Sequence, residues 1–419
     1  MYTVSFRIAS LILTASCLQS ALIAGDTDWN QWRGPKRTGI LESGSFGAAL
    51  DESSLKRQWS IGLGPGYSGP IARGNRVFVT ETRDRQFEVV RAIDLSTGKQ
   101  IWQTEWQGAM TVPFFAMANG SWIRSTPTLV DDDLFVAGMR DVLVCLSADT
   151  GKIKWRVDFT KALNSPLPSF GFVCSPLVDG EFVYVQAGGG FVKLRRADGA
   201  ILWNSLADGG GMYGSAFSSP TIAKVAGKRQ AIVQTRKSLC GVDLESGKKL
   251  WSADVEAFRG MNILTPTIIG DRIFTSSYGG GSFLFEVTRN DSGEFMVKQL
   301  WRNKVQGYMS SPVVIDGHIY LHLRNQRFAC IEVASGKEKW ITQPFGKYWS
   351  LIASGDQIVA LDERGELLLI RASEKEFKLI SRRKISEKPT WAHIGLLGSE
   401  ILIRDLGGMT VWSWKDLAE

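Results

Sequence analysis

The chain has few of the residues from which metal sites and disulfide frameworks are built. Of its 419 residues, 5 are cysteine and 3 are histidine. Four cysteines lie beyond the first 25 residues (Cys145, Cys174, Cys240 and Cys330), and no two of them are adjacent or in CxxC spacing. We therefore expect buried free thiols, with neither a disulfide framework nor a metal site.

Signals for catalysis are equally scarce. No Ser-His-Asp set can be assigned from spacing. His318 and His322 share one face of a predicted strand with Tyr320, a pattern that favours packing between sheets. Asp131 to Asp133 fall in a predicted hairpin turn, where polar residues are expected. We interpret that run as a turn, with calcium binding as the alternative.

Neither sign of charge dominates a long stretch of the chain. The formal net charge is +7, and the 49 Lys and Arg are interleaved with the 42 Asp and Glu. The densest basic run, Arg382-Arg383-Lys384, is soon followed by Glu387. We interpret this run as a solvated strand edge that discourages edge-to-edge pairing, and we expect no nucleic-acid partner.

Beyond residue 25 no segment is long and apolar enough to cross a membrane. The first residues resemble an export signal, because Arg7 precedes the apolar run Ile8 to Leu18 and small residues follow. That run is too short to span a bilayer, so we expect residues 1–24 to be a cleaved signal peptide and the protein to be periplasmic or cell-envelope associated. Cys17 lies in a lipoprotein-like box whose apolar residue is displaced by one position, so lipid anchoring there is not expected.

A repeated phrase fills most of the remaining chain. The unit from Ser311-Pro312 to Trp340 contains three short apolar runs and the start of a fourth, separated by turns such as Asp316-Gly317. Related phrases open at Pro70, Pro127, Pro176, Pro220 and Pro266 and end at Trp102, Trp155, Trp203, Trp251 and, more loosely, Trp301. Successive tryptophans are about 39 to 53 positions apart, a period typical of four-stranded β-propeller blades.

The two ends of the chain complete each other. Leu55 to Ile61 resembles the last strand of a repeat, but the other three strands do not precede it. The missing strands are predicted at Trp391 to Ile394, Glu400 to Arg404 and Met409 to Trp414. We therefore predict an all-β, eight-bladed propeller of four-stranded antiparallel blades, with about 45 residues per blade and the last blade closed by the N-terminal strand. The propeller covers residues 55–416, and residues 25–54 form an irregular extension lying across the ring.

The repeat resembles that of pyrroloquinoline quinone (PQQ)-type propellers, the quinoprotein alcohol dehydrogenase-like superfamily. The phrase SPxVxxGxVYVxxxxGxLxxxDxxTGKxxW is clearest in residues 126–155, 175–203 and 311–340, and Trp29-x-x-Trp32-Arg33-Gly34-Pro35 is similar to the start of exported members. The alternative of a WD40 propeller is weaker, because no Trp-Asp dipeptide occurs.

This resemblance implies two functions. One is a quinone-dependent dehydrogenase acting on an alcohol or sugar, with PQQ and calcium as cofactors. Such enzymes usually have a vicinal Cys-Cys disulfide, a Trp below the cofactor, Glu and Asn ligands for calcium and an Asp base. This chain lacks adjacent cysteines, and no unambiguous set of Glu, Asn and Asp stands at matching positions. Some quinone-binding relatives, however, do without the cysteine pair. The sequence therefore favours the non-enzymatic outer-membrane assembly (BamB-like) members, and we expect a non-catalytic binding or scaffolding module in the cell envelope.

Aromatic and basic residues precede the predicted innermost strands, where propellers bind ligands at the mouth of the central channel. The candidate ligand-binding residues are Tyr67, Trp122, Arg124, Phe172, Tyr213, Arg259, Asn262, Tyr308, Tyr348, Trp349, Trp391 and His393. They could stack on a planar or sugar-like ligand and pair with its anionic groups. The alternative is that they only fill the narrow end of the channel. The partner is expected to be an envelope protein or a small polar or aromatic ligand, and the protein a monomer.

Overall fold

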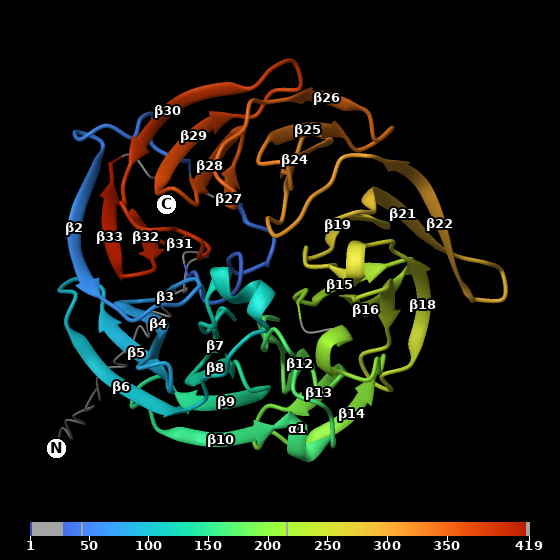
Figure 1. Ribbon diagram of the computed structural model, residues 1–419, viewed down its shortest axis with the longest axis horizontal. Helices are drawn as coiled ribbons and strands as arrows, with labels where there is room; N and C mark the ends of the chain where they lie inside the picture. Colours follow the sequence, from blue (N-terminus) through green and yellow to red (C-terminus); the bar gives the residue numbers. More distant parts are fainter. Residues whose placement is uncertain (2–27, 43–44, 215–216, 416–419) are drawn as a thin grey trace.

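The computed structural model describes Met1 and residues 28–42, 45–214 and 217–415. The predicted signal peptide and Cys17 lie outside these ranges. Eight antiparallel sheets are arranged as blades around a central axis (Figure 1), which confirms the predicted eight-bladed propeller. Among the described residues, no helix has the length and apolar character needed to cross a membrane.

Each blade is a meander whose first strand lies at the axis. Blade 1 contains β3 (Ile71–Arg73), β4 (Arg76–Arg83), β5 (Phe87–Asp94) and β6 (Gln100–Gln107). Blade 2 contains β7 (Thr128–Val130), β8 (Asp133–Gly138), β9 (Val142–Ser147) and β10 (Ile153–Asp158). Blade 3 contains β11 (Leu177–Asp179), β12 (Phe182–Ala187), β13 (Gly190–Arg195) and β14 (Ile201–Ser205). Blade 4 contains β15 (Thr221–Val225), β16 (Lys228–Gln234), β17 (Ser238–Val242) and β18 (Lys249–Asp254).

The second half of the ring repeats this order. Blade 5 contains β19 (Thr267–Ile269), β20 (Arg272–Ser277), β21 (Gly281–Arg289) and β22 (Phe295–Asn303). Blade 6 contains β23 (Val313–Ile315), β24 (His318–His322), β25 (Phe328–Glu332) and β26 (Glu338–Ile341). Blade 7 contains β27 (Trp349–Ser354), β28 (Gln357–Asp362), β29 (Glu366–Arg371) and β30 (Lys378–Lys384). Blade 8 contains β31 (Gly395–Leu397), β32 (Glu400–Asp405), β33 (Gly408–Trp414) and β2 (Leu55–Gly62).

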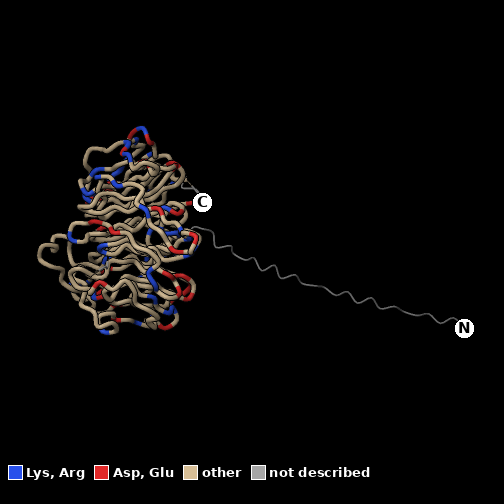
Figure 2. Tube along the Cα trace, turned by 90° about the vertical axis from the view of Figure 1, so that its right-hand side faces the viewer, with Lys and Arg blue, Asp and Glu red and all other residues tan. Residues whose placement is uncertain are grey.

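Strand β2 closes the ring as predicted. It pairs antiparallel with β33, with Leu55 opposite Trp414 and Ile61 opposite Met409. The basic run of residues 382–384 lies in the outermost strand of blade 7, where Arg382 and Lys384 are exposed. Arg383 differs from the expected solvated edge, because it donates a hydrogen bond to the Leu55 carbonyl at 2.5 Å. This side chain therefore joins blade 7 to the closing strand. Seen edge-on, the ring carries charges of both signs along its rim (Figure 2).

The Ser/Thr-Pro phrase joins the blades near the axis. The backbone N–H of Gly69 donates to the hydroxyl of Thr126, that of Thr126 to Ser175, and that of Ser175 to Ser219, at 3.1, 3.1 and 2.9 Å. Thr265 donates to Ser311 in the same way. Proline suits the next position, because it starts the strand without needing a donor. The repeated hydroxyl thus satisfies a backbone donor of the preceding blade.

The terminal tryptophans join the blades at their outer edges. The indole Nε1 of Trp102 donates to the Ala148 carbonyl at 2.9 Å, and that of Trp155 donates to the Arg196 carbonyl at 2.8 Å. Trp59, Trp203, Trp301 and Trp340 bond the following blade in the same way. Five of these indole rings also pack over the glycine of a turn in the following blade. The glycines are Gly98, Gly151, Gly199, Gly247 and Gly336. The periodic Trp of one blade and the periodic Gly of the next blade therefore pack against each other.

Trp251 departs from this pattern. Its Nε1 donates to Gln230 Oε1 within its own blade, at 2.7 Å. The next blade has a longer β21–β22 hairpin, and Ser292-Gly293 lie at its far end. The long hairpin extends outward from the ring in Figure 1. The four described cysteines are all buried and free.

The extension before β2 runs inside the ring, where β1 (Ile40–Leu41) pairs parallel with β27. Trp29 is buried and its carbonyl accepts from Ala72 N at 2.9 Å, while Trp32 Nε1 donates to Thr265 Oγ1 at 3.2 Å. Both tryptophan residues therefore anchor the extension. Its hydrogen bonds reach seven blades, through Ala72, Leu129, Ser175, Thr265, Pro312, Ala353 and Trp414.

Candidate functional site

The loops that lead into the innermost strands lie around the axis on the face turned toward the viewer in Figure 1. Three short helices lie around it: η1 (Phe114–Asn119), η2 (Gly211–Tyr213) and η3 (Phe258–Gly260). Beneath them is a cavity of about 510 Å³, which we call the funnel. It continues into an inner chamber of about 130 Å³, because both are lined by Arg124, Val173, Phe217, Ile263 and Met309. A fourth short helix, α1 (Phe159–Ala162), does not line either space.

The neck between funnel and chamber has a simple sequence signature. All five shared residues stand three positions before the proline that opens a blade, and Tyr67 of blade 1 has the same spacing and lines the chamber. The Ser or Thr directly before the proline bonds the neighbouring blade, so its position is fixed. The residue two positions before this Ser or Thr is thereby directed toward the axis in five blades, and in blade 1 Tyr67 stands two positions before Gly69.

Two series of aromatic contacts line the opening. The first joins Phe258, Tyr278, Tyr308, Tyr348, Trp391 and Tyr67, with successive ring centroids 4.9, 5.6, 6.4, 4.0 and 4.4 Å apart. The second joins Phe114, Phe115, Phe170 and Phe217, with separations of 5.6, 6.1 and 5.6 Å. Rings in such contacts support one another and present a large apolar surface.

An arginine stands at the inner end of each series. The Arg124 guanidinium lies 5.8 Å from the Tyr67 ring, and that of Arg236 lies 4.8 Å from the Phe217 ring. Burial lowers the pKa of both arginines, and burial raises the pKa of Tyr67 to about 12. Arg259 adds a third positive charge to the funnel wall. Among the described lining residues of funnel and chamber there is no Asp, Glu or Cys. The space therefore favours apolar groups and anions.

The extension closes the inner chamber from the other side. Trp32 lines the chamber beside His393, and the two rings are 4.9 Å apart. Below them Arg33 donates to the Pro312 carbonyl, and Arg37 donates to the carbonyls of Ser175 and Pro176 at 3.0 and 2.8 Å. Burial and the neighbouring Arg33 lower the pKa of His393 to about 3, so its imidazole is neutral at pH 7. The chamber is thus a blind pocket with an aromatic floor.

Most of the predicted ligand-binding residues meet at this site. Tyr67, Arg124, Tyr348, Trp349, Trp391 and His393 line the chamber, and Tyr213, Arg259 and Tyr308 join Arg124 in lining the funnel. Trp122 packs against Gly120, outside both linings. Trp349 contributes through its edge only, because it is buried and its Nε1 donates to Asp362 at 2.9 Å.

Besides Trp122, two further predicted residues lie away from the space and must be corrected. Phe172 is completely buried and packs against Phe159 between blades, so Phe170 presents the ring to the funnel. The two residues lie on opposite sides of Gly171, which has a φ of +79°. Asn262 is also buried, and its amide donates to the carbonyls of Arg236 and Val255. It holds the loop of blade 5 in place.

Sequence reasoning missed Phe170, Phe217, Arg236 and Tyr278. Phe217 could have been found from its spacing of three before Pro220. Tyr278 follows β20 and Arg236 follows β16, in turns within a blade rather than in loops between blades. These turns reach the same face, although no local signal separates them from ordinary hairpins.

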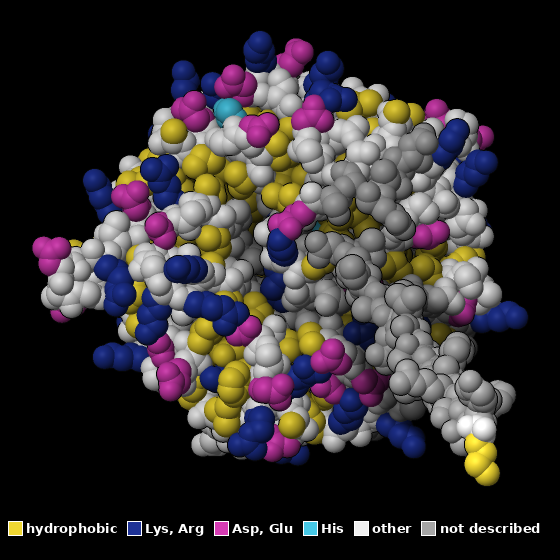
Figure 3. Space-filling view, turned by 180° about the vertical axis from the view of Figure 1, so that it is seen from behind, with side chains coloured by type: hydrophobic (Ala, Val, Ile, Leu, Met, Phe, Trp, Pro, Cys, Tyr) yellow, Lys and Arg dark blue, Asp and Glu magenta, His cyan; other side chains and the backbone are white. Residues whose placement is uncertain are grey.

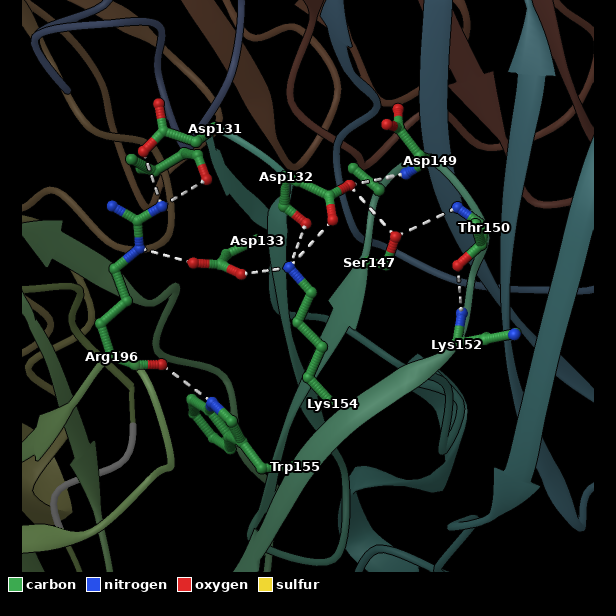
Figure 4. Close-up of polar contacts among 12 residues, drawn as sticks. Asp131, Asp132, Asp133, Ser147, Asp149, Thr150, Lys152, Lys154, Trp155 and Arg196 are labelled. Carbon is green, nitrogen blue, oxygen red and sulfur yellow. Dashed lines mark hydrogen bonds and ion pairs between the residues drawn. The ribbon is translucent and has the colours of Figure 1, made fainter.

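The acidic run is a structural cluster rather than a free ligand set (Figure 4). Arg196 of blade 3 bonds Asp131 at 2.7 Å and Asp133 at 2.6 Å, while Lys154 bonds Asp132 at 2.9 Å and Asp133 at 2.6 Å. All three carboxylates therefore have cationic partners. Within the described residues no group of three or more His, Cys, Asp or Glu side chains could hold a metal ion.

The lining does not fit a calcium-bound quinone cofactor. Calcium prefers carboxylate and carbonyl oxygens, and the described lining residues offer no carboxylate. Asn262, the asparagine predicted at the mouth, uses its amide to hold the backbone. Among the described lining residues His393 supplies the one imidazole, and its Nδ1 donates to the Ile394 carbonyl at 3.0 Å. We therefore assign no reaction step that depends on a calcium-bound quinone to these residues.

Comparisons with known proteins agree with the architecture. Residues 86–342 match the family model described as outer membrane protein assembly factor BamB. The BamB of Yersinia pestis is 24% identical over 306 residues, covering 69% of this chain and 71% of the relative. The BamB of Moranella endobia (strain PCIT) is 22% identical over 366 residues, covering 80% and 84%.

Solved structures show the same fold. The crystal structure of BamB from Moraxella catarrhalis gives a TM-score of 0.61 at 16% identity, covering 86% of this chain and 98% of that one. The quinohemoprotein alcohol dehydrogenase from Comamonas testosteroni gives 0.60 at 13% identity, covering 94% and 81%. At such identities the two likenesses show the fold alone.

Proposed function

Because the chain belongs to the family of outer membrane protein assembly factor BamB, we propose that it is a non-catalytic scaffolding module that binds another protein of the cell envelope. The observation that carries this proposal is the family match, which covers more than half of the chain. The proposed location is the periplasm or envelope, following the export signal predicted in residues 1–24.

The site supports binding rather than chemistry. Its described lining has no carboxylate or thiol that could act as a general base or nucleophile. Its one histidine is buried against Trp29 and Trp32 at the chamber floor. An open aromatic surface of this kind is typical of sites that recognise a partner.

Affinity purification from envelope extracts tests the proposal. The full chain, tagged at its C-terminus, is expected to recover an outer-membrane assembly protein, identified by mass spectrometry. An unrelated exported β-propeller with the same tag is the control. Recovery of the same proteins by both baits would contradict the proposal.

Cofactor titration tests the dehydrogenase alternative. PQQ and calcium are added to the purified protein, and dye reduction is followed with a panel of alcohols and sugars. We expect neither saturable quinone binding nor turnover. Saturable binding with turnover would replace the scaffolding proposal by an enzymatic one.

A further inference from the structure

Five large exposed apolar side chains gather around the funnel. Phe114 is 84% exposed, and Phe115 and Met117 of the same helix are also exposed. Tyr213 of η2 is 68% exposed, and Phe258 of η3 is exposed as well. We call these five residues the crown. In Figure 1 the cyan coil of η1 lies near the centre of the ring, and the green and yellow coils of η2 and η3 lie over the inner parts of the neighbouring blades.

Elsewhere the exposed apolar side chains are scattered. Ile101, Ile153, Leu202, Met296 and Leu379 lie singly on the outermost strands of five different blades. Isolated residues of this kind are ordinary on protein surfaces, whereas a gathered patch marks an interaction site. On the opposite face, the visible Lys, Arg, Asp and Glu side chains are interspersed around the rim (Figure 3). The crown is therefore the surface most suited to bind a partner.

The funnel below the crown adds a charge requirement. Arg124 is half-buried, its Nη2 donates to the Gly120 carbonyl at 2.6 Å, and its buried Nε has no hydrogen-bond partner in the described structure. Arg259 is exposed at the funnel wall, with its guanidinium 5.2 Å from the Phe258 ring. The carboxylate of Asp208 attracts the Arg236 guanidinium electrostatically, but Asp208 does not line the funnel. An anionic group entering the funnel would meet several guanidinium groups and no described carboxylate.

The apolar crown and the arginines of the funnel together specify the chemistry of the ligand. A small anion would satisfy the arginines and leave the crown exposed, while an apolar surface would cover the crown and leave the buried guanidinium of Arg124 without an anion. We propose that the funnel and crown bind an acidic polypeptide segment, whose carboxylates reach Arg124 and Arg259 while its apolar side chains lie on the crown. The inference rests on the proposed scaffolding function and specifies the surface and the chemistry of the partner.

A synthetic peptide in which Asp and Glu alternate with Phe and Leu is the probe. Its binding to the full chain is followed by fluorescence anisotropy, and the control peptide carries Asn and Gln at the acidic positions. We expect saturable binding of the acidic peptide and about tenfold weaker binding of the neutral one, since a charge-assisted contact contributes about 1.4 kcal/mol. Equal binding of both peptides, or no binding of either, would overturn the inference.

Exposed variants locate the binding without endangering the fold. Arg259→Gln and Phe114→Ser are each expected to weaken acidic-peptide binding about tenfold. The matched controls, Arg57→Gln on β2 and Met296→Ser on β22, are exposed at the outer edge and should bind as the wild type does. Wild-type affinity in both funnel variants would overturn the inference.

A second measurement separates this inference from the proposed function. The wild type and the Arg259→Gln and Phe114→Ser variants are compared as baits in envelope extracts. Reduced recovery of the partner by the variants supports the inference. Undiminished recovery would leave the scaffolding function in place and overturn the assignment of the partner to this surface.

Discussion

Gly199 faces the indole of Trp155 so closely that a Cβ on its backbone would lie 2.7 Å from ring carbon Cε3. The same indole donates to the Arg196 carbonyl at 2.8 Å, so blade 2 and blade 3 meet through one ring and one glycine turn. The contact recurs around the propeller, and it explains why Gly and Trp share one period in the sequence. Its contribution to stability can be measured.

Gly199→Ala should destabilise the protein by about 2–4 kcal/mol, because the new methyl group must displace the Trp155 ring. Gly180→Ala in the same blade is the matched control. Both glycines have positive φ, +74° and +56°, but a Cβ at Gly180 meets nothing within 4 Å. Its cost should be limited to backbone strain of about 1 kcal/mol. Urea unfolding measures both, and equal losses would contradict a packing role for Trp155.

Arg196→Met should lower the free energy of unfolding by about 2 kcal/mol, because Asp131 and Asp133 lose their shared cation. The neighbouring Arg195→Met is the control. The Arg196 side chain is 14% exposed, whereas Arg195 is 50% exposed and pairs only with Asp198 across a turn. The control should change stability by less than about 0.5 kcal/mol. Urea unfolding at low salt measures the loss in both variants. Equal losses in Arg196→Met and Arg195→Met would show that the cluster of Figure 4 does not stabilise the fold.

Arg37→Met tests the anchoring of the extension. The guanidinium donates to the carbonyls of Ser175 and Pro176 of blade 3, so its loss removes two hydrogen bonds and leaves the Pro176 carbonyl with the Thr128 hydroxyl as its donor. We expect a loss of at least about 2 kcal/mol in the free energy of unfolding. Arg57→Met, on the exposed edge of β2, should change it little. A stable Arg37→Met protein would mean that the extension does not hold the blades together.

Glu88 gives a pH dependence with a defined sign. Its carboxylate is buried, where it accepts hydrogen bonds from Trp106 Nε1 at 2.8 Å and from Met139 N at 2.5 Å, and burial raises its pKa to about 7. A raised pKa in the folded state gives stability that is present below about pH 4.5 and lost as pH rises through 7. Asp141 acts in the same direction, because burial raises its pKa to about 7 as well.

The Glu88→Gln variant isolates that dependence. Between pH 5 and pH 9 the fall in the free energy of unfolding should be about 2 kcal/mol smaller in the variant than in the wild type. At pH 5 the variant should be the less stable of the two, because an amide nitrogen cannot accept the second hydrogen bond. Urea unfolding at both pH values is the measurement. An identical fall in the two proteins would show that Glu88 does not ionise in this range.

The sequence by itself determined the blades, their number and the closure of the ring. Glycine in a turn, proline at the start of a strand and tryptophan at its end each meet a requirement of the backbone or of the neighbouring blade, and they recur at a regular interval. Even the neck of the funnel follows this interval, since its five residues each stand three positions before the proline that opens a blade.

Only the tertiary structure decided which loop side chains face the axis. Phe170 and Phe172 are equivalent by composition, but the turn at Gly171 sends the first into the funnel and the second between blades. Tyr278 joins the aromatic series from a turn within blade 5, and Arg33 and Arg37 bond blades 6 and 3 from one short segment. Irregular loops have no period from which a side-chain direction can be predicted, because their paths are set by contacts with residues far away in the sequence.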